Sequence, residues 1–149
     1  MRVSVIGGSR VDEETYEEAR DVGRLLGERG HTIVCGGYGG VMEAVCRGAR
    51  ERDGHTIGIL QGSDPREGNE YVETGIATGM GDARNALVVL NGDAVVAVDG
   101  AAGTLSELGH ALVAKKPIAG LGTRDLSDFS GFEPVASPEE AVESVEARR

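Results

Sequence analysis

The sequence contains almost no lysine and few aromatic side chains. Lys115 and Lys116 are its lysines, it has no tryptophan, and phenylalanine and tyrosine together make up 3% of the 149 residues. Because acids are plentiful, the formal net charge is −10 at pH 7. The basic surface that nucleic-acid binding requires is therefore missing, and we expect no nucleic-acid partner.

An excess of acids with little lysine is typical of proteins from salt-loving organisms, whose hydrated acidic surfaces keep them in solution. In roughly 1 M salt the Debye length is about 3 Å. The overall negative charge then does not keep an anionic ligand from a locally positive site. The composition predicts an acidic, halophilic surface and still allows phosphate binding.

Long apolar segments and clusters of metal-ligating side chains are also missing. No apolar run approaches the roughly 20 residues that a membrane-spanning helix needs, and the chain enters a strand almost directly after Met1. Cys35 and Cys46 have no histidine or further cysteine at ligand spacing. We expect a cytoplasmic protein with two reduced thiols, no metal site and no membrane partner.

Short β-branched segments alternate with amphipathic segments along the whole chain. The expected strands are residues 3–6, 31–35, 56–60, 71–77, 94–98, 117–121 and 132–135, and the expected helices are 13–29, 41–52, 83–90, one that ends near 114 and one that starts at 137. Strands that are apolar throughout, alternating with helices, indicate a parallel sheet covered on both faces. We predict an α/β fold with a doubly wound, Rossmann-like, mostly parallel sheet in a single domain of residues 1–149.

Four glycine-rich turns follow expected strands, at residues 7–9, 36–40, 79–81 and 100–103. In a doubly wound sheet these turns lie at the carboxyl edge, where ligands bind near the point at which the strand order reverses. The turns at 36–40 and 100–103 precede helices, whose free N–H groups can together hold a phosphate. Thr104 and Asp82 are the expected caps of the helices after two of the turns.

Several common ligand and catalytic motifs are absent. The first strand ends in Gly-Gly-Ser-Arg rather than Gly-x-Gly-x-x-Gly, and Cys35 ends the second where a ribose-binding acid would be expected, which argues against a nicotinamide or flavin dinucleotide. A P-loop lysine motif, a nucleophile elbow and a lysine placed for a pyridoxal phosphate Schiff base are missing too. A phosphorylated small molecule that carries a sugar is the remaining ligand class.

Two segments together carry a family resemblance. Gly36-Gly37-Tyr38-Gly39-Gly40-Val41-Met42 and Gly103-Thr104-Leu105-Ser106-Glu107 resemble the paired signatures of the LOG (Lonely Guy) family, and the similarity extends from residue 3 to about residue 121. Members of that Rossmann-like family were long labelled lysine decarboxylases. LOG enzymes are phosphoribohydrolases that cut the N-glycosidic bond of nucleoside 5′-monophosphates. The resemblance implies this hydrolysis, with no cofactor required, rather than pyridoxal-dependent decarboxylation.

The family pattern implies roles for individual residues. Glu107 matches the catalytic acid, which would stabilise an oxocarbenium-like ribose or orient water. Arg84 matches the arginine of the family's Arg-Lys pair and is the second expected catalytic residue, which would bind the phosphate or assist the leaving base. Binding of the ligand and its phosphate is expected from the glycine turns and their neighbours: Gly8, Ser9, Gly36, Gly37, Gly39, Gly40, Met42, Gly100, Gly103 and Thr104. In a purely structural interpretation, Arg84 pairs with Asp82 or Glu107, and Glu107 only stabilises the positive end of its helix.

Three departures from the LOG pattern bear on catalysis. The usual Pro-Gly-Gly before the phosphate turn is Asp99-Gly100-Ala101, the lysine after Arg84 is Asn85, and Met42 is followed by Glu43. The missing lysine removes a positive charge near the expected anion. Binding is therefore better supported than catalysis.

Two functions remain as hypotheses. The first is a LOG-like hydrolase that releases a free base from a nucleoside monophosphate. The alternative is a non-catalytic carrier or sensor of a nucleotide or of the molybdenum cofactor, because the chain is most similar to the LOG sub-branch that includes molybdenum-cofactor carrier proteins. In both cases the resemblance implies a homo-oligomer, a dimer or larger.

Overall fold

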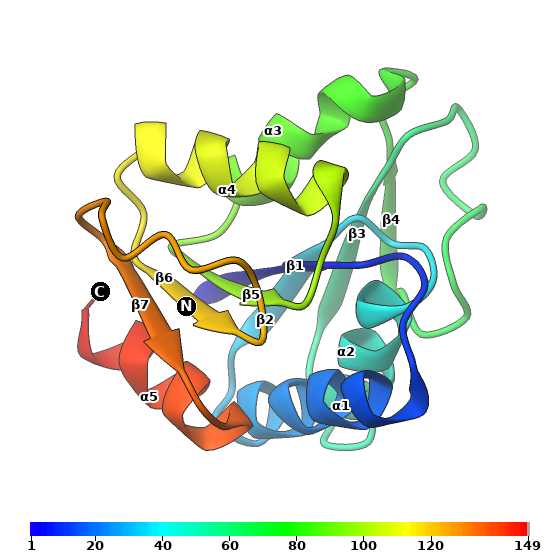
Figure 1. Ribbon diagram of the computed structural model, residues 1–149. Coiled ribbons are helices and arrows are strands. Elements are labelled where there is room, and N and C mark those ends of the chain that lie inside the picture. Colours follow the sequence, from blue (N-terminus) through cyan, green and yellow to red (C-terminus); the bar gives the residue numbers. More distant parts are fainter. Residues whose placement is uncertain (149) are drawn as a thin grey trace.

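The core of the molecule is a parallel sheet. The computed structural model describes residues 1–148, and its strands are β1 (Arg2–Gly7), β2 (Thr32–Cys35), β3 (Thr56–Leu60), β4 (Thr74–Ala77), β5 (Ala94–Val98), β6 (Ile118–Leu121) and β7 (Phe132–Val135). The strands of this described part form one 7-stranded sheet in the order β4-β3-β2-β1-β5-β6-β7 (Figure 1), and each neighbouring pair is parallel. The strand order reverses between β1 and β5, which is where doubly wound sheets bind ligands. The predicted α/β fold is confirmed, with a sheet that is parallel throughout.

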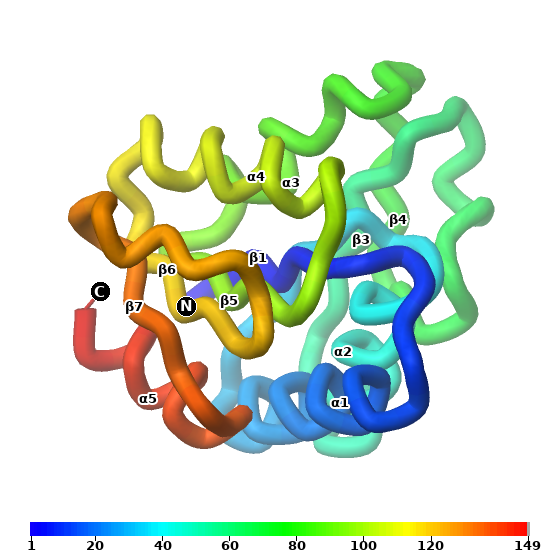
Figure 2. The backbone as a smooth tube through the Cα atoms, in the orientation of Figure 1, coloured from blue at the N-terminus to red at the C-terminus, as the bar shows by residue number. Residues whose placement is uncertain are grey.

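Helices cover both faces of the sheet. One face carries α1 (Glu13–Glu28), α2 (Val41–Arg50) and α5 (Pro138–Ala147), and the other carries α3 (Asn85–Leu90) and α4 (Ala102–Val113) (Figures 1 and 2). A separate buried apolar cluster forms under each group of helices, and β5 between them is buried along its whole length, as strands covered on both faces require. Within residues 1–148, no helix is both long enough and apolar enough to cross a membrane.

The pairing of β1 with β5 determines the geometry of the carboxyl edge. Ile6 is level with Ala97 and Gly7 with Val98, so the chain leaves both strands at the same height. A Cβ atom at Gly7 would lie 2.3 Å from the Val98 carbonyl oxygen, so only glycine allows this close approach. In Figure 2 the segments after β1 and β5 lie at the same edge of the sheet.

The expected strand at residues 71–77 is shorter in the structure. β4 begins at Thr74, because the residues before it are held in a turn by Asn69. Tyr71 donates its N–H to the Asn69 side-chain oxygen at 2.9 Å, and Val72 donates to the Asn69 carbonyl oxygen at 3.2 Å. The apolar residues at the start of this segment therefore pack as part of a turn and not as part of the strand.

The expected helix at 83–90 also differs, and the prediction that Asp82 caps it is wrong. A 3-10 turn, η1 (Gly81–Arg84), precedes α3, which starts at Asn85 without a side-chain cap. Asp82 lies inside η1, and its carboxylate accepts a hydrogen bond from the Gln61 side-chain nitrogen at 2.8 Å. The acid is thus engaged with the loop after β3.

Helices α1 and α2 pack with their backbones in direct contact. A Cβ atom at Gly23 would lie 2.1 Å from the Val45 carbonyl oxygen, and one at Gly48 would lie 2.0 Å from the Arg20 carbonyl oxygen. Both distances are below any van der Waals contact. The glycines in these helices therefore serve interhelix packing, although glycine weakens an isolated helix.

We expect Gly23→Ala to lower the free energy of unfolding by about 1–3 kcal/mol, because the added methyl group overpacks the α1–α2 contact. Gly109 in α4 offers a matched control, since no neighbouring atom lies within 4 Å of a Cβ built there. Gly109→Ala should raise the free energy of unfolding by about 0.5–1 kcal/mol through helix propensity and a less flexible unfolded chain. Urea unfolding measures both changes, and shifts of the same sign would contradict the close contact.

Candidate ligand-binding site

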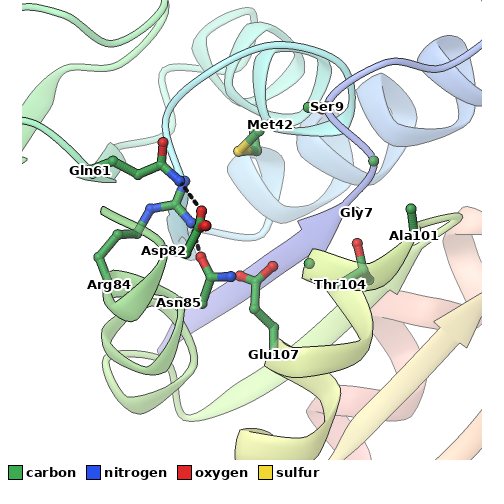
Figure 3. Close-up of a pocket in the computed structure, with 12 residues that line it drawn as sticks. Gly7, Ser9, Met42, Gln61, Asp82, Arg84, Asn85, Ala101, Thr104 and Glu107 are labelled. Atoms are coloured by element: carbon green, nitrogen blue, oxygen red, sulfur yellow. Dashed lines mark hydrogen bonds between the residues drawn. The ribbon is translucent and has the colours of Figure 1, made fainter. Parts of the chain in front are cut away.

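A cavity of about 170 Å³ opens at the carboxyl edge of the sheet, beside the ends of β1 and β5 (Figure 3). Its walls come from the turn after β1, the first turn of α2, the loop after β3, the segment η1–α3 and the start of α4. They consist of Gly7, Gly8, Ser9, Met42, Gln61, Asp82, Arg84, Asn85, Ala101, Gly103, Thr104 and Glu107. Among them are both predicted catalytic residues and about half of the predicted binding residues.

The N-terminus of α4 faces this cavity with unpaired backbone donors. Ala101 occupies the cap position, and no side chain caps the helix. The N–H of Leu105 is bonded to the Ala101 carbonyl oxygen at 3.0 Å, so the N–H groups of the preceding residues, 102 to 104, have no acceptor within the helix. Donors of this kind, together with the helix dipole, form an anion site.

The prediction that Thr104 caps α4 is wrong. A capping residue has a non-helical backbone, as Ala101 has (φ −129°, ψ −149°), whereas Thr104 already lies in the first turn. Its side chain is 4% exposed and lines the cavity. Within the described residues, no hydrogen bond engages its hydroxyl, which therefore remains available to a ligand.

The turn at residues 36–40 lies behind the cavity wall and does not line it. The N–H of Val41, at the start of α2, donates to the Gly8 carbonyl oxygen at 2.9 Å, so the protein itself occupies part of that helix N-terminus. Gly40 has φ +62°, and a Cβ there would lie 2.2 Å from the same Gly8 oxygen. The turn thus supports the segment after β1, and Met42 is its neighbour that reaches the cavity.

The other predicted glycines of that turn also meet protein atoms closely. A Cβ at Gly36 would lie 2.6 Å from Arg84 Nη2, one at Gly37 would lie 2.5 Å from the Leu60 side chain, and one at Gly39 would lie 3.2 Å from the Ser9 carbonyl oxygen. Gly100 lies outside this cavity as well and lines an adjoining one. A direct binding role for these glycines stays a prediction.

Arg84 is buried and held in place by the protein. Its Nη1 donates to the Asn85 side-chain oxygen, and its Nη2 donates to the Gly36 carbonyl oxygen at 3.3 Å. The guanidinium carbon lies 5.7 Å from the centre of the Tyr38 ring, close enough for a cation–π interaction. Its Nε has no hydrogen-bond partner among the described residues, although buried donors are normally paired.

Glu107 extends from α4 into the cavity, near Asn85 (Figure 3). It is 7% exposed, and no hydrogen bond to its carboxyl occurs within residues 1–148. Burial raises its pKa to about 7, and the nearby positive charge of Arg84 offsets part of this effect. Close to neutral pH the carboxyl is therefore divided between its protonated and charged forms.

Some cavity residues were not identified from the sequence. Gln61 donates to Asp82 at 2.8 Å, and the Asn85 side-chain nitrogen donates to Ser106 Oγ at 3.2 Å. Gln61 begins the long loop after β3. Asn85 and Ala101 stand where the chain departs from the LOG pattern. Each of these features of the sequence could have identified its residue as part of the site. Asp82 and Gly7 also line the cavity, although the sequence predicts only a helix cap at Asp82 and a turn at Gly7.

A cavity at the switch point of a parallel sheet, beside an uncapped helix N-terminus, is typical of Rossmann-like proteins that bind ligands at this edge. Among residues 1–148, no group of three or more histidine, cysteine or acidic side chains could hold a metal ion. The donors of the cavity suit an organic anion. The chain belongs to the SLOG cluster4 family, whose model matches residues 1–146.

Relatives with known structures are similar over almost the whole chain. The molybdenum cofactor binding protein of Rippkaea orientalis has a TM-score of 0.92 and 32% identity, covering 99% of this chain and 96% of that one. The molybdenum cofactor carrier protein of Chlamydomonas reinhardtii has a TM-score of 0.90 and 31% identity, covering 98% and 96%. An uncharacterised protein of Archaeoglobus fulgidus is 41% identical over 145 residues, 95% of this chain and 92% of its own length. The predicted relation to LOG-like proteins and their carrier branch is confirmed.

Glu107→Gln should change how stability depends on pH. The pKa of Glu107 rises from its ordinary 4.5 to about 7 in the folded protein, so between these values the folded state binds more protons than the unfolded state. Its contribution to stability is complete below pH 4.5 and is lost as the pH rises through 7, a loss of about 3 kcal/mol. The neutral glutamine escapes this loss, so the advantage of Glu107→Gln should grow from pH 4.5 to pH 8.

Urea unfolding across this pH range measures the difference between the variant and the wild type. The exposed Glu70 provides the control, since Glu70→Gln removes the same charge from the surface. Parallel pH profiles for the wild type and Glu107→Gln would contradict the raised pKa.

Proposed function

We propose that this protein binds a phosphorylated pterin, the molybdenum cofactor, in the switch-point cavity and acts as its carrier. The observation that carries the proposal is the uncapped N-terminus of α4, which turns unpaired N–H groups toward a cavity lined by Ser9, Arg84 and Thr104. The similarity to a molybdenum cofactor binding protein at 32% identity and a TM-score of 0.92 supports the same ligand.

The chemistry of the cavity suits the two parts of this ligand. A phosphate group at the start of α4 would accept hydrogen bonds from the free N–H groups, and the helix dipole would favour its charge. The other end of the cavity presents the amides of Gln61 and Asn85 and the carboxylate of Asp82, which can bind the donors and acceptors of a pterin ring. Arg84, which lines the cavity, adds the positive charge of its guanidinium group near the ligand.

Asn85 favours binding over cleavage. Where LOG enzymes have a lysine, Asn85 accepts from Arg84 Nη1 and donates to Ser106, so this position contributes no positive charge. A carrier needs its ligand held and shielded, and it needs no group that polarises a leaving base.

A single substitution can remove one phosphate donor without disturbing the helix. Ala102 is the first residue of α4, and Ala101 before it has a non-helical backbone. Proline is accepted at a first helical position, because the N–H group that it lacks has no partner within the helix there. Ala102→Pro therefore keeps α4 and deletes one unpaired N–H group, which should weaken binding about tenfold, as for a lost hydrogen bond to a charged group.

The measurement is anaerobic equilibrium dialysis against molybdenum cofactor released from a molybdoenzyme, with bound molybdenum determined by mass spectrometry. Ala102→Gly keeps the N–H group and should bind as the wild type does. Wild-type protein that retains no more molybdenum than an unrelated protein of similar size would overturn the proposal.

Glu107 supports a second candidate function, nucleoside 5′-monophosphate phosphoribohydrolase. Its carboxyl lies in the same cavity as the start of α4, so a nucleotide whose phosphate sits at that helix would place its ribose near a carboxyl group. Such a carboxylate stabilises the positive charge that develops on the sugar as the glycosidic bond breaks.

Chromatography of free base from AMP and cytokinin monophosphates tests this second function. A hydrolase should release base, and Glu107→Gln should lower the rate by about 100-fold or more, as for loss of a group that stabilises the transition state. Base release that is equal in the wild type and Glu107→Gln would exclude Glu107 as the catalytic acid.

The remaining expectations on context stay predictions. They are a homo-oligomeric assembly, a cytoplasmic location, an adaptation to salt and the lack of a nucleic-acid partner. These predictions are supported by the acidic, lysine-poor composition and by the family resemblance.

A further inference from the structure

A second cavity, of about 270 Å³, adjoins the first at the same edge of the sheet. It lies against the next face of α4, where Leu105 and Leu108 form its apolar side, and Thr123 and Arg124 from the loop after β6 form its rim. Ala101 and Thr104 line both cavities. The first turn of α4 is therefore the wall between them.

The first cavity is small for the ligand that its polar groups indicate. Its volume of about 170 Å³ is below the range of about 300–1,000 Å³ that is usual for small-molecule sites. If one ring system of a phosphorylated ligand fills this cavity, the other groups of the ligand must lie outside the cavity. The second cavity offers that space directly across the start of α4.

Glu107 supports a polar ligand in the first cavity. Its side chain extends into that cavity, the residue is 7% exposed, and its carboxyl accepts no hydrogen bond within the described residues. A carboxyl in this setting gains from a hydrogen-bond partner, and a polar ring in the cavity would supply one.

The wall between the cavities is suited to phosphate. The free N–H groups of residues 102 to 104 and the hydroxyl of Thr104 lie there, at the positive end of α4. Arg84 and Arg124 are the cationic residues among those that line the two cavities, one on each side of the wall. Arg124 is exposed and, among residues 1–148, takes part in no ion pair or hydrogen bond.

We propose that the two cavities form one bipartite site for a ligand in which two ring-bearing groups are joined by a diphosphate. One ring binds among the polar groups of the first cavity, and the diphosphate lies across the first turn of α4. The second ring-bearing group, a nucleoside, rests on Leu105 and Leu108 with Arg124 over it. The inference rests on the proposed function and specifies its ligand as a dinucleotide form of the cofactor.

Two probes distinguish a ligand that occupies only the first cavity from a ligand that occupies both cavities. The first is the molybdenum cofactor with its single phosphate, and the second is the same cofactor extended by GMP through a phosphoanhydride bond. Anaerobic equilibrium dialysis gives the affinity of the full-length chain for each. We expect the extended form to bind at least about tenfold more tightly than the unextended cofactor. Arg124→Ala should remove this gain in affinity without changing the affinity for the unextended cofactor.

Arg52→Ala is the matched control, since Arg52 is an exposed arginine in the turn after α2, remote from both cavities, and its variant should behave as the wild type. If the unextended cofactor binds but the extended form gains nothing, or if Arg124→Ala weakens both probes equally, the bipartite site is wrong and the carrier function stands. If neither probe binds, the proposed function fails, and this inference fails with it.

Discussion

The backbone pairing of β1 with β5 is the contact on which the rest of the site depends. It joins the two halves of the sheet and sets Gly7 level with Val98, which a side chain at Gly7 would prevent. The segment after β1 is then fixed from its other side, because Val41 donates to the Gly8 carbonyl oxygen. Ser9 and the start of α4 thus both line one cavity at the carboxyl edge of the sheet. A segment that is held in place before binding lowers the conformational entropy that the protein must lose when a ligand binds.

Local electrostatics in this cavity differ from those of the whole molecule. The chain carries a net charge of −10, yet the donors that meet in the cavity are backbone N–H groups and a buried arginine. Two acids, Asp82 and Glu107, also line the cavity. Burial raises the pKa of Glu107 to about 7, so near neutral pH part of its population carries no charge that would repel an anion. A negative protein can therefore offer a phosphate a favourable site, because the nearest few groups outweigh charges that are distant and screened by salt.

Local rules predicted those features whose causes lie within a few residues. The strand at Ala94–Val98 follows from its unbroken apolar run. The last helix begins where it is expected, with its cap at residue 137, and there Ser137 follows the capping rule by accepting the N–H of Glu140. The same rule failed at Asp82 and Thr104. Capping depends on the backbone conformation at one residue, and tertiary contacts set that conformation: Asp82 is bonded to Gln61 from a loop far away in the sequence, and α4 starts earlier than its threonine suggests.

The sequence by itself determined the alternation of strands and helices, the parallel sheet, the glycine turns at its carboxyl edge and the relation to the LOG-like proteins. These follow from residue type and short-range spacing. Only the tertiary structure decided that residues 36–40 support the site from behind, that Gln61 and Asn85 line the cavity, and that a second cavity shares the first turn of α4. Which side chains share a wall depends on how segments separated by tens of residues pack together, and no local period in the chain encodes that packing.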